Sequence, residues 1–173
     1  MSKRIMNEVM CLAEDNKIKM FYQDTDSIHL FEKDVKPLED NYRKMYNREL
    51  NGKNMGQFHV DFDLDGCKDI YSEKFIGLGK KSYLDCLVGT DIETGETKRG
   101  YHIRMKGVPN DSILYEAEKR NTSLEDLYDY LYTGNSVIFD LLKCPEGDKV
   151  RFKNNKNMTI TTLTTFEREV RYK

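Results

Sequence analysis

Apolar and polar positions near the start of the chain follow first a helical period and then a strand period. Apolar residues between positions 5 and 13 recur at helical spacing behind a candidate N-cap at Ser2, which predicts a helix ending near Asp15. Residues 18–22 and 27–31 alternate between apolar and polar positions, which predicts two strands. We therefore expect the acidic segment between these strands to form a tight turn.

The rest of the chain repeats both periods. The predicted helices cover residues 38–50, 111–120 and 123–132. Ser123, with Asp126 three residues later, is a capping signal for the last of them. The predicted strands cover residues 58–64, 70–78, 82–88 and 101–105, followed by two or three antiparallel strands between Lys149 and Tyr172. Gly89–Arg99 is polar and is expected to form an excursion between strands.

A change of character near Gly107-Val108-Pro109 predicts a boundary between two subdomains, residues 1–106 and 107–173. The 173 residues suffice for one domain with its own core or for two small ones. The order of periods predicts an α+β chain in which the strands pair in antiparallel fashion.

The composition, 38% hydrophobic and 34% charged without tryptophan, is typical of a wettable chain. No segment approaches the roughly 18 apolar residues of a membrane span, so we expect no membrane partner and an intracellular location. The net charge of -2 conceals segregation, because Asp61–Asp69 is acidic whereas four short segments are basic. These segments are Lys80-Lys81, Lys98-Arg99, Arg104–Lys106 and Lys149–Lys156. They form either solvated faces or a surface that follows phosphates.

The sulfur and imidazole side chains do not form the spacings typical of metal sites. The cysteines, which we expect to be reduced thiols, are Cys11, Cys67, Cys86 and Cys144. The histidines, which we interpret as structural, are His29, His59 and His102.

Asp61–Gly66 imitates the start of a calcium-binding EF-hand loop, with alternating acids and a glycine in sixth place. The final glutamate of such a loop would fall at position 72, which is Ser72, and Lys68 occupies a position that should be apolar. Alternation from Phe58 to Leu64 favours a strand instead.

Asp24 and Asp26 place two carboxylates on the predicted tight turn. Residues i and i+2 of an extended or tightly turned backbone point to the same side, which creates a compact cation site. Mg²⁺ prefers carboxylate oxygens together with water and substrate phosphates, and it serves phosphoryl transfer. Spacing alone leaves a solvated acidic turn as the alternative.

The surrounding string, Phe21-Tyr-Gln-Asp-Thr-Asp-Ser-Ile-His-Leu30, closely resembles the YxDTDS motif of family B DNA polymerases. Further along, Gly79-Lys-Lys-Ser-Tyr-Leu84 resembles the KxY motif of the same family. Reverse transcriptases carry YxDD instead, without the threonine spacer. The order of the motifs, the short distance to the C-terminus and the β-rich ending resemble the protein-primed branch found in phages, linear plasmids and viruses.

This resemblance implies an antiparallel palm-type sheet flanked by helices over residues 1–106, followed by a small β-rich thumb-like subdomain over residues 107–173. It implies a DNA-directed DNA polymerase, a nucleotidyltransferase that adds deoxynucleotides to a primer 3′ end with two Mg²⁺ ions. The implied partners are primer–template DNA, deoxynucleoside triphosphates, a terminal protein primer and a separate N-terminal polymerase segment. The implied location is the site of DNA replication.

Carried over to this sequence, the YxDTDS match implies that Asp26 binds both catalytic metals and that Asp24 is its partner. Tyr22 and Thr25 match positions that shape the site near the primer end.

The KxY match implies that Lys81 and Tyr83 hold the primer strand near its 3′ end. A lysine supplies a point charge to phosphate, and a tyrosine supplies a rigid ring with a hydroxyl. Lys106 would be a further phosphate contact or, alternatively, a solvated strand lysine.

The sequence lacks the N-terminal aspartate motif of the family and the lysine-bearing helix that grips the triphosphate. We therefore expect an incomplete polymerase, inactive by itself. The alternatives are a non-catalytic remnant that binds primer–template DNA and one subunit of a split polymerase.

Overall fold

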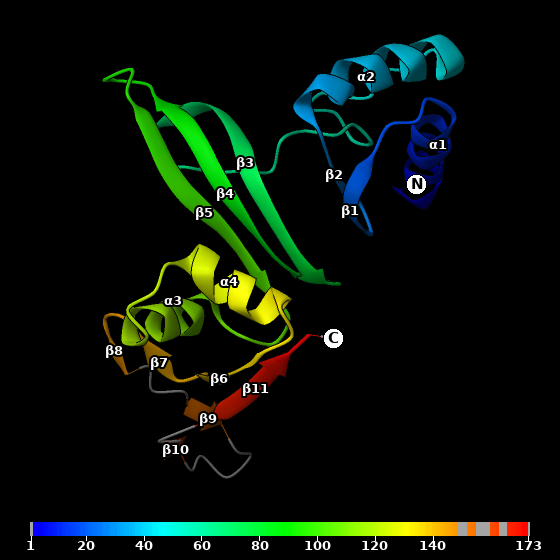
Figure 1. Cartoon of the computed structure of the whole chain (residues 1–173). Helices are drawn as coiled ribbons and strands as arrows, with labels where there is room; N and C mark the ends of the chain where they lie inside the picture. Colours follow the sequence, from blue (N-terminus) through cyan, green and yellow to red (C-terminus); the bar gives the residue numbers. More distant parts are fainter. Residues whose placement is uncertain (1, 149–151, 155–159, 163–165, 173) are drawn as a thin grey trace. The chain divides into compact units, whose positions relative to one another are not determined.

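The structure, a computed structural model, describes residues 2–148, 152–154, 160–162 and 166–172 (Figure 1). The fold is α+β, as predicted, and its described part contains four helices and antiparallel sheets. The chain divides into two compact units, Met1–Asp61 (unit 1) and Phe62–Lys173 (unit 2).

Unit 1 packs two helices and a hairpin around one core. Helix α1 (Ser2–Asp15) and the antiparallel strands β1 (Met20–Asp24) and β2 (Ser27–Leu30) confirm the predicted elements. Helix α2 (Glu32–Tyr46) completes the unit. The buried core residues are Ile5, Val9, Leu12, Ala13, Leu38, Tyr42 and Leu50.

Helix α2 begins six residues before the position predicted for it and ends four residues earlier, at Tyr46 rather than residue 50. The predicted bounds were wrong, and the helix continues through Pro37, which lies inside it. Acidic residues in the first turn favour the earlier start because they complement the helix dipole. The left-handed backbone of Asn47, with φ of 51°, ends the helix.

A partly buried carboxylate ties the helices of unit 1 together. Glu8 of α1 accepts hydrogen bonds from Arg4 Nε at 2.8 Å, from the Tyr42 hydroxyl of α2 at 2.9 Å and from Arg48. Burial raises the pKa of Glu8, but the three donors outweigh burial and lower this pKa below its ordinary value. The charged form of Glu8 therefore stabilises unit 1.

Unit 2 is built on a three-stranded antiparallel sheet with the order β3-β4-β5 (Figure 1). Strands β3 (Cys67–Gly79), β4 (Ser82–Asp91) and β5 (Thr97–Met105) confirm the predicted hairpin and extend it. The excursion predicted between Gly89 and Arg99 is, in the structure, only a short turn after Asp91, because β4 and β5 include most of its residues. The carboxylate of Asp91 shapes this turn, because it accepts the backbone N–H groups of Glu93 and Thr94, each at 2.9 Å.

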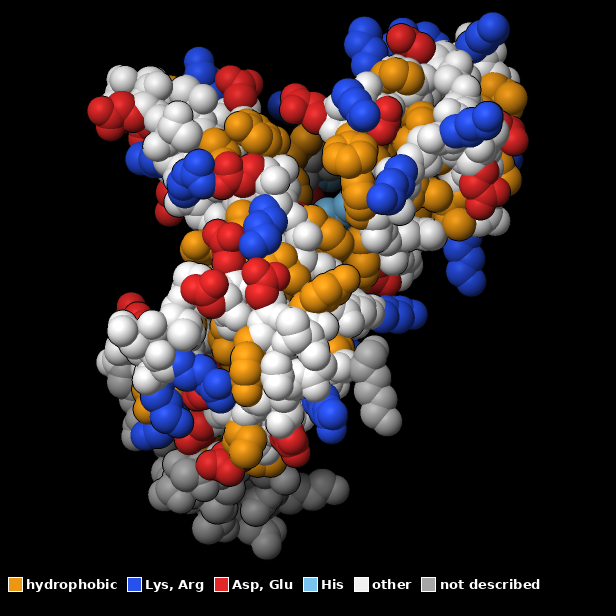
Figure 2. Space-filling view, in the orientation of Figure 1, with side chains coloured by type: hydrophobic (Ala, Val, Ile, Leu, Met, Phe, Trp, Pro, Cys, Tyr) orange, Lys and Arg blue, Asp and Glu red, His pale blue; other side chains and the backbone are white. Residues whose placement is uncertain are grey.

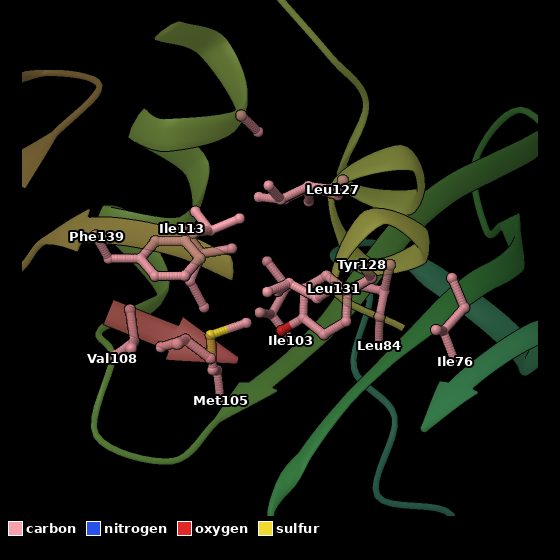
Figure 3. Close-up of a cluster of buried hydrophobic side chains, with 14 of the residues drawn as sticks. Ile76, Leu84, Ile103, Met105, Val108, Ile113, Leu127, Tyr128, Leu131 and Phe139 are labelled. Carbon is pink, nitrogen blue, oxygen red and sulfur yellow. The ribbon is translucent and has the colours of Figure 1, made fainter. Parts of the chain in front are cut away.

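Helices α3 (Asn110–Lys119) and α4 (Leu124–Tyr132), both as predicted, pack against one face of this sheet near one of its ends. The Ser123 hydroxyl accepts the backbone N–H of Asp126 at 3.0 Å, which confirms the predicted cap. Figure 3 shows side chains from the strands and both helices pointing toward one another in one core. Its labelled members are Ile76, Leu84, Ile103, Met105, Val108, Ile113, Leu127, Tyr128, Leu131 and Phe139.

This core includes residues from both sides of position 107. The boundary in the chain between the two compact units falls between Asp61 and Phe62. The division into palm and thumb at residues 106 and 107 concerns function and stays a prediction.

The C-terminal part of unit 2 contains short strands. Strand β6 (Ser136–Asp140), which the sequence did not predict, pairs with β11 (Glu167–Arg171). Strand β9 (Phe152–Asn154) pairs with β10 (Ile160–Thr162), so antiparallel strands do occur in the predicted region. A smaller pair joins β7 (Lys143–Cys144) to β8 (Gly147–Asp148). Most of the basic segment Lys149–Lys156 lies outside the described residues.

The strand predicted over residues 58–64 is wrong, because only Phe58 forms a bridge, to Asn51, and residues 59–64 form no strand. The alternation has another cause. Phe62 packs edge-on against His102, with ring centroids 5.8 Å apart, and Leu64 lies over Gly100. The segment is thus extended and half-buried on the sheet without joining its ladder.

Candidate functional site

The acidic pair occupies the tip of the β1–β2 hairpin. Asp24, the last residue of β1, pairs with Ser27, the first of β2, so that Thr25 and Asp26 alone form the turn. Asp24 is half-buried and Asp26 is exposed. The predicted context of strand, tight turn and strand is therefore confirmed.

Thr25 orients the neighbouring carboxylate. Its backbone N–H lies 3.0 Å and its hydroxyl 3.2 Å from Asp24 Oδ1, and both donate to this oxygen. The Asp24 carboxylate is thereby held at the tip, beside the freely solvated Asp26. The tip thus presents two carboxylates separated by one residue.

These carboxylates suit Mg²⁺ in chemistry, since hard oxygen donors are its preferred protein ligands. Within the described ranges no group of three or more His, Cys, Asp or Glu side chains is placed to hold a metal. Asp24 and Asp26 would accordingly supply part of a coordination sphere. Mg²⁺ usually completes its octahedron with water and substrate phosphates.

The base of the hairpin is anchored to the core of unit 1. Met20, Ile28 and Leu30 pack against this core. Tyr22, predicted near the primer end, pairs with His29 across the strands, and their rings meet edge-to-face at 5.4 Å. The tip is therefore carried by a supported hairpin.

A basic cluster lies at the other candidate site, the β3–β4 hairpin of unit 2. Lys80 and Lys81 form the turn, and Lys81 adopts a left-handed backbone with φ of 59°. Ser82, the next residue, pairs with Met105 of β5 and accepts the backbone N–H of Lys106 through its hydroxyl at 3.2 Å. Lys81, Tyr83 and Lys106, predicted separately from the sequence, are thus brought together at one end of the sheet.

Tyr83 lies within a row of aromatic rings on the outer face of the sheet, the face opposite Leu84 and Ile103. Its ring stacks on His102 at 5.9 Å with an interplanar angle of 22°, and its other neighbour is Phe75 at 5.6 Å. Phe62 extends the row beyond His102. Phe75 and His102 could not be recognised from the sequence as neighbours of Tyr83, because only strand register places them beside it.

Basic and acidic side chains are interspersed over the surface shown in Figure 2, so the balance of charge has to be considered separately for each part of the surface. Several cations elsewhere in unit 2 have carboxylate partners. These pairs are Lys74 with Glu125 and Asp129, Lys98 with Asp91, Arg99 with Glu73, and Arg120 with Glu116.

The charge balance is different at the end of the sheet near the β3–β4 turn. In the part of the chain that the structure describes, the side chains of Lys80, Arg104 and Lys106 are exposed and form no ion pair. The guanidinium of Arg168 also lies there, against Gly107, where a Cβ atom would overlap it. This end of the sheet is consequently a local concentration of uncompensated positive charge, which suits a polyanion.

Comparisons with known protein families, with curated proteins and with solved structures find no match. None of the helices in the described ranges combines the length and the apolar character needed to cross a bilayer.

Proposed function

We propose that this chain supplies part of the palm of a DNA-directed DNA polymerase of the family B type. In this proposal Asp24 and Asp26 hold catalytic metal, and the basic end of the β3–β4–β5 sheet holds primer–template DNA. The observation that carries the proposal is the Asp24-Thr25-Asp26 tip on an antiparallel hairpin, within a string that resembles YxDTDS.

The chemistry follows from what each residue offers. When bound, Mg²⁺ neutralises charge on the attacking and leaving oxygens of phosphoryl transfer. Asp26 offers an exposed carboxylate, and Thr25 holds the Asp24 carboxylate beside it. Catalysis by such residues consists of positioning and charge neutralisation and needs no covalent intermediate.

Lys81, Tyr83 and Lys106 serve the DNA in this proposal. Lysines contact phosphates as point charges, and the Tyr83 ring, held between Phe75 and His102, offers a rigid surface near the primer end. Residues from 107 onward would act as a thumb-like subdomain. The aspartate and lysine motifs missing from the sequence would come from another polymerase segment, and a terminal protein is the proposed primer.

Metal binding at the tip tests the proposal. Manganese, a paramagnetic substitute for Mg²⁺, should broaden the amide NMR signals of Thr25, Asp26 and Ser27 in the isolated chain. Asp26→Asn should abolish this broadening, because it removes the charge and keeps the shape. Asp63→Asn, which removes an equal charge outside the hairpin, is the matched control. Broadening centred elsewhere, or unchanged in Asp26→Asn, would refute the metal site.

A second function, DNA binding without catalysis, is favoured by the basic end of the sheet, which needs no metal. It predicts that the chain binds a primer–template duplex in the presence of a chelator. If a preparation completed with the missing motifs binds duplex yet never extends a primer, the binding function is the correct one.

A further inference from the structure

Arg104 lies beside Tyr83 although the two residues are far apart in sequence. The register of β4 and β5 pairs them directly, so both side chains lie on the outer face with their Cβ atoms about 5 Å apart. Lys106 follows two residues later, about 7 Å further along an extended backbone. Arg104 thus occupies the space between the aromatic row and the lysines of the basic end.

The backbone at Arg104 is fixed from the opposite face of the sheet. The hydroxyl of Tyr128, a fully buried residue of α4, donates to the Arg104 carbonyl at 3.1 Å. The flanking residues Ile103 and Met105 are buried in the core of unit 2. The backbone that carries this cation is held in place before any ligand arrives, which lowers the entropic cost of ordering the strand on binding.

The charge of Arg104 is uncompensated. Arg99, in the same strand, pairs with Glu73, whereas the exposed guanidinium of Arg104 forms no ion pair with any residue of the described ranges. Guanidinium groups bind phosphate through two parallel hydrogen bonds, and aromatic faces beside them suit bases or sugars. An acidic peptide would bind to the positive charge but would gain less than a nucleic acid from contact with the row of aromatic rings.

We infer that Arg104 is a further nucleic-acid-binding residue, whose guanidinium binds a backbone phosphate next to the Tyr83 ring. This phosphate would belong to the same DNA strand as the phosphate bound by Lys106. This inference rests on the proposed function for the class of ligand. It adds a residue that neither motif includes and that only the pairing of β4 with β5 places at the site.

The test measures affinity of the chain for a fluorescein-labelled primer–template duplex between about 50 and 200 mM salt. Arg104→Ala should flatten the plot of log affinity against log salt by about 0.9, which corresponds to roughly eightfold weaker binding at about 0.1 M salt. Arg104→Lys should restore most of the slope because it restores the charge. Arg99→Ala removes the same charge from the same strand and should leave the slope unchanged.

An unchanged slope in folded Arg104→Ala would overturn the inference, as would the absence of salt-dependent duplex binding by the parent chain. Competition by inorganic polyphosphate as strong as that by DNA, at equal charge, would overturn the assignment to nucleic acid. The metal test is separate, because Asp26→Asn should not alter duplex binding in a chelator. Loss of the metal site with a normal Arg104 effect would therefore refute only the catalytic half of the proposed function.

Discussion

The hydroxyl of Tyr128 offers a sharp test of how unit 2 supports its basic end. This phenol is fully buried on α4, and it donates to the carbonyl of Arg104 at 3.1 Å. Tyr128→Phe keeps the ring and its packing but leaves a carbonyl without this donor. We expect a loss of about 1–2 kcal/mol in the free energy of unfolding, the usual cost of removing one partner of a buried hydrogen bond.

The assay is urea unfolding followed by circular dichroism. The midpoint should fall without a change in the slope m, because the surface exposed on unfolding is the same. Tyr130→Phe is the matched control, since Tyr130 lies on the same helix with its side chain exposed and should change stability by less than about 0.5 kcal/mol. Equal effects of the two substitutions would refute the claim that the hydroxyl supports β5.

The pH dependence gives a second readout for Tyr128. Burial raises the pKa of its phenol above the ordinary value of 10.0. A group whose pKa is raised by folding contributes stability below its unfolded pKa and loses it as the pH rises through the folded pKa. The stability difference between the parent and Tyr128→Phe should therefore shrink above about pH 10. A difference that grew with pH would contradict this reasoning.

Three further predictions concern the acidic tip, the basic turn and unit 1. The chain alone should extend no primer. In a completed enzyme, Asp26→Asn should slow synthesis by a factor of at least about 10³, which corresponds to a loss of roughly 4 kcal/mol of transition-state stabilisation. Near-normal synthesis by a folded Asp26→Asn variant would contradict the metal assignment. Lys81→Ala should flatten the salt dependence of duplex binding by about one unit and Tyr83→Phe should be milder, whereas an unchanged slope would remove Lys81 from the DNA contacts. Glu8→Gln should destabilise unit 1 at neutral pH, with the deficit vanishing as the pH falls through the lowered pKa of Glu8, because a carboxylate with a depressed pKa contributes stability only while it is charged. Urea unfolding between about pH 3 and 7 checks this last prediction, and a constant deficit would refute it.

The sequence by itself determined the elements whose signals are local. Helical spacing predicted α1, α3 and α4, and the Ser123 cap is an interaction between residues three positions apart. Alternation around Asp24-Thr25-Asp26 likewise predicted a hairpin with the acids at its tip. Such features depend on backbone propensities and on side chains that meet within one turn, so a short window of sequence contains the information.

Tertiary structure decided the features that depend on register and on distant partners. Leu64 and Phe62 alternate like a strand, yet the bare backbone of Gly100 and the His102 ring hold them on the sheet outside its ladder. The sequence does not reveal that Arg99 and Arg104 have different roles. Only the folded structure pairs Arg99 with a carboxylate and places Arg104 beside Tyr83. The physical reason is that antiparallel pairing joins residues far apart in the chain. A shift of one residue in register would turn each side chain of a strand to the other face.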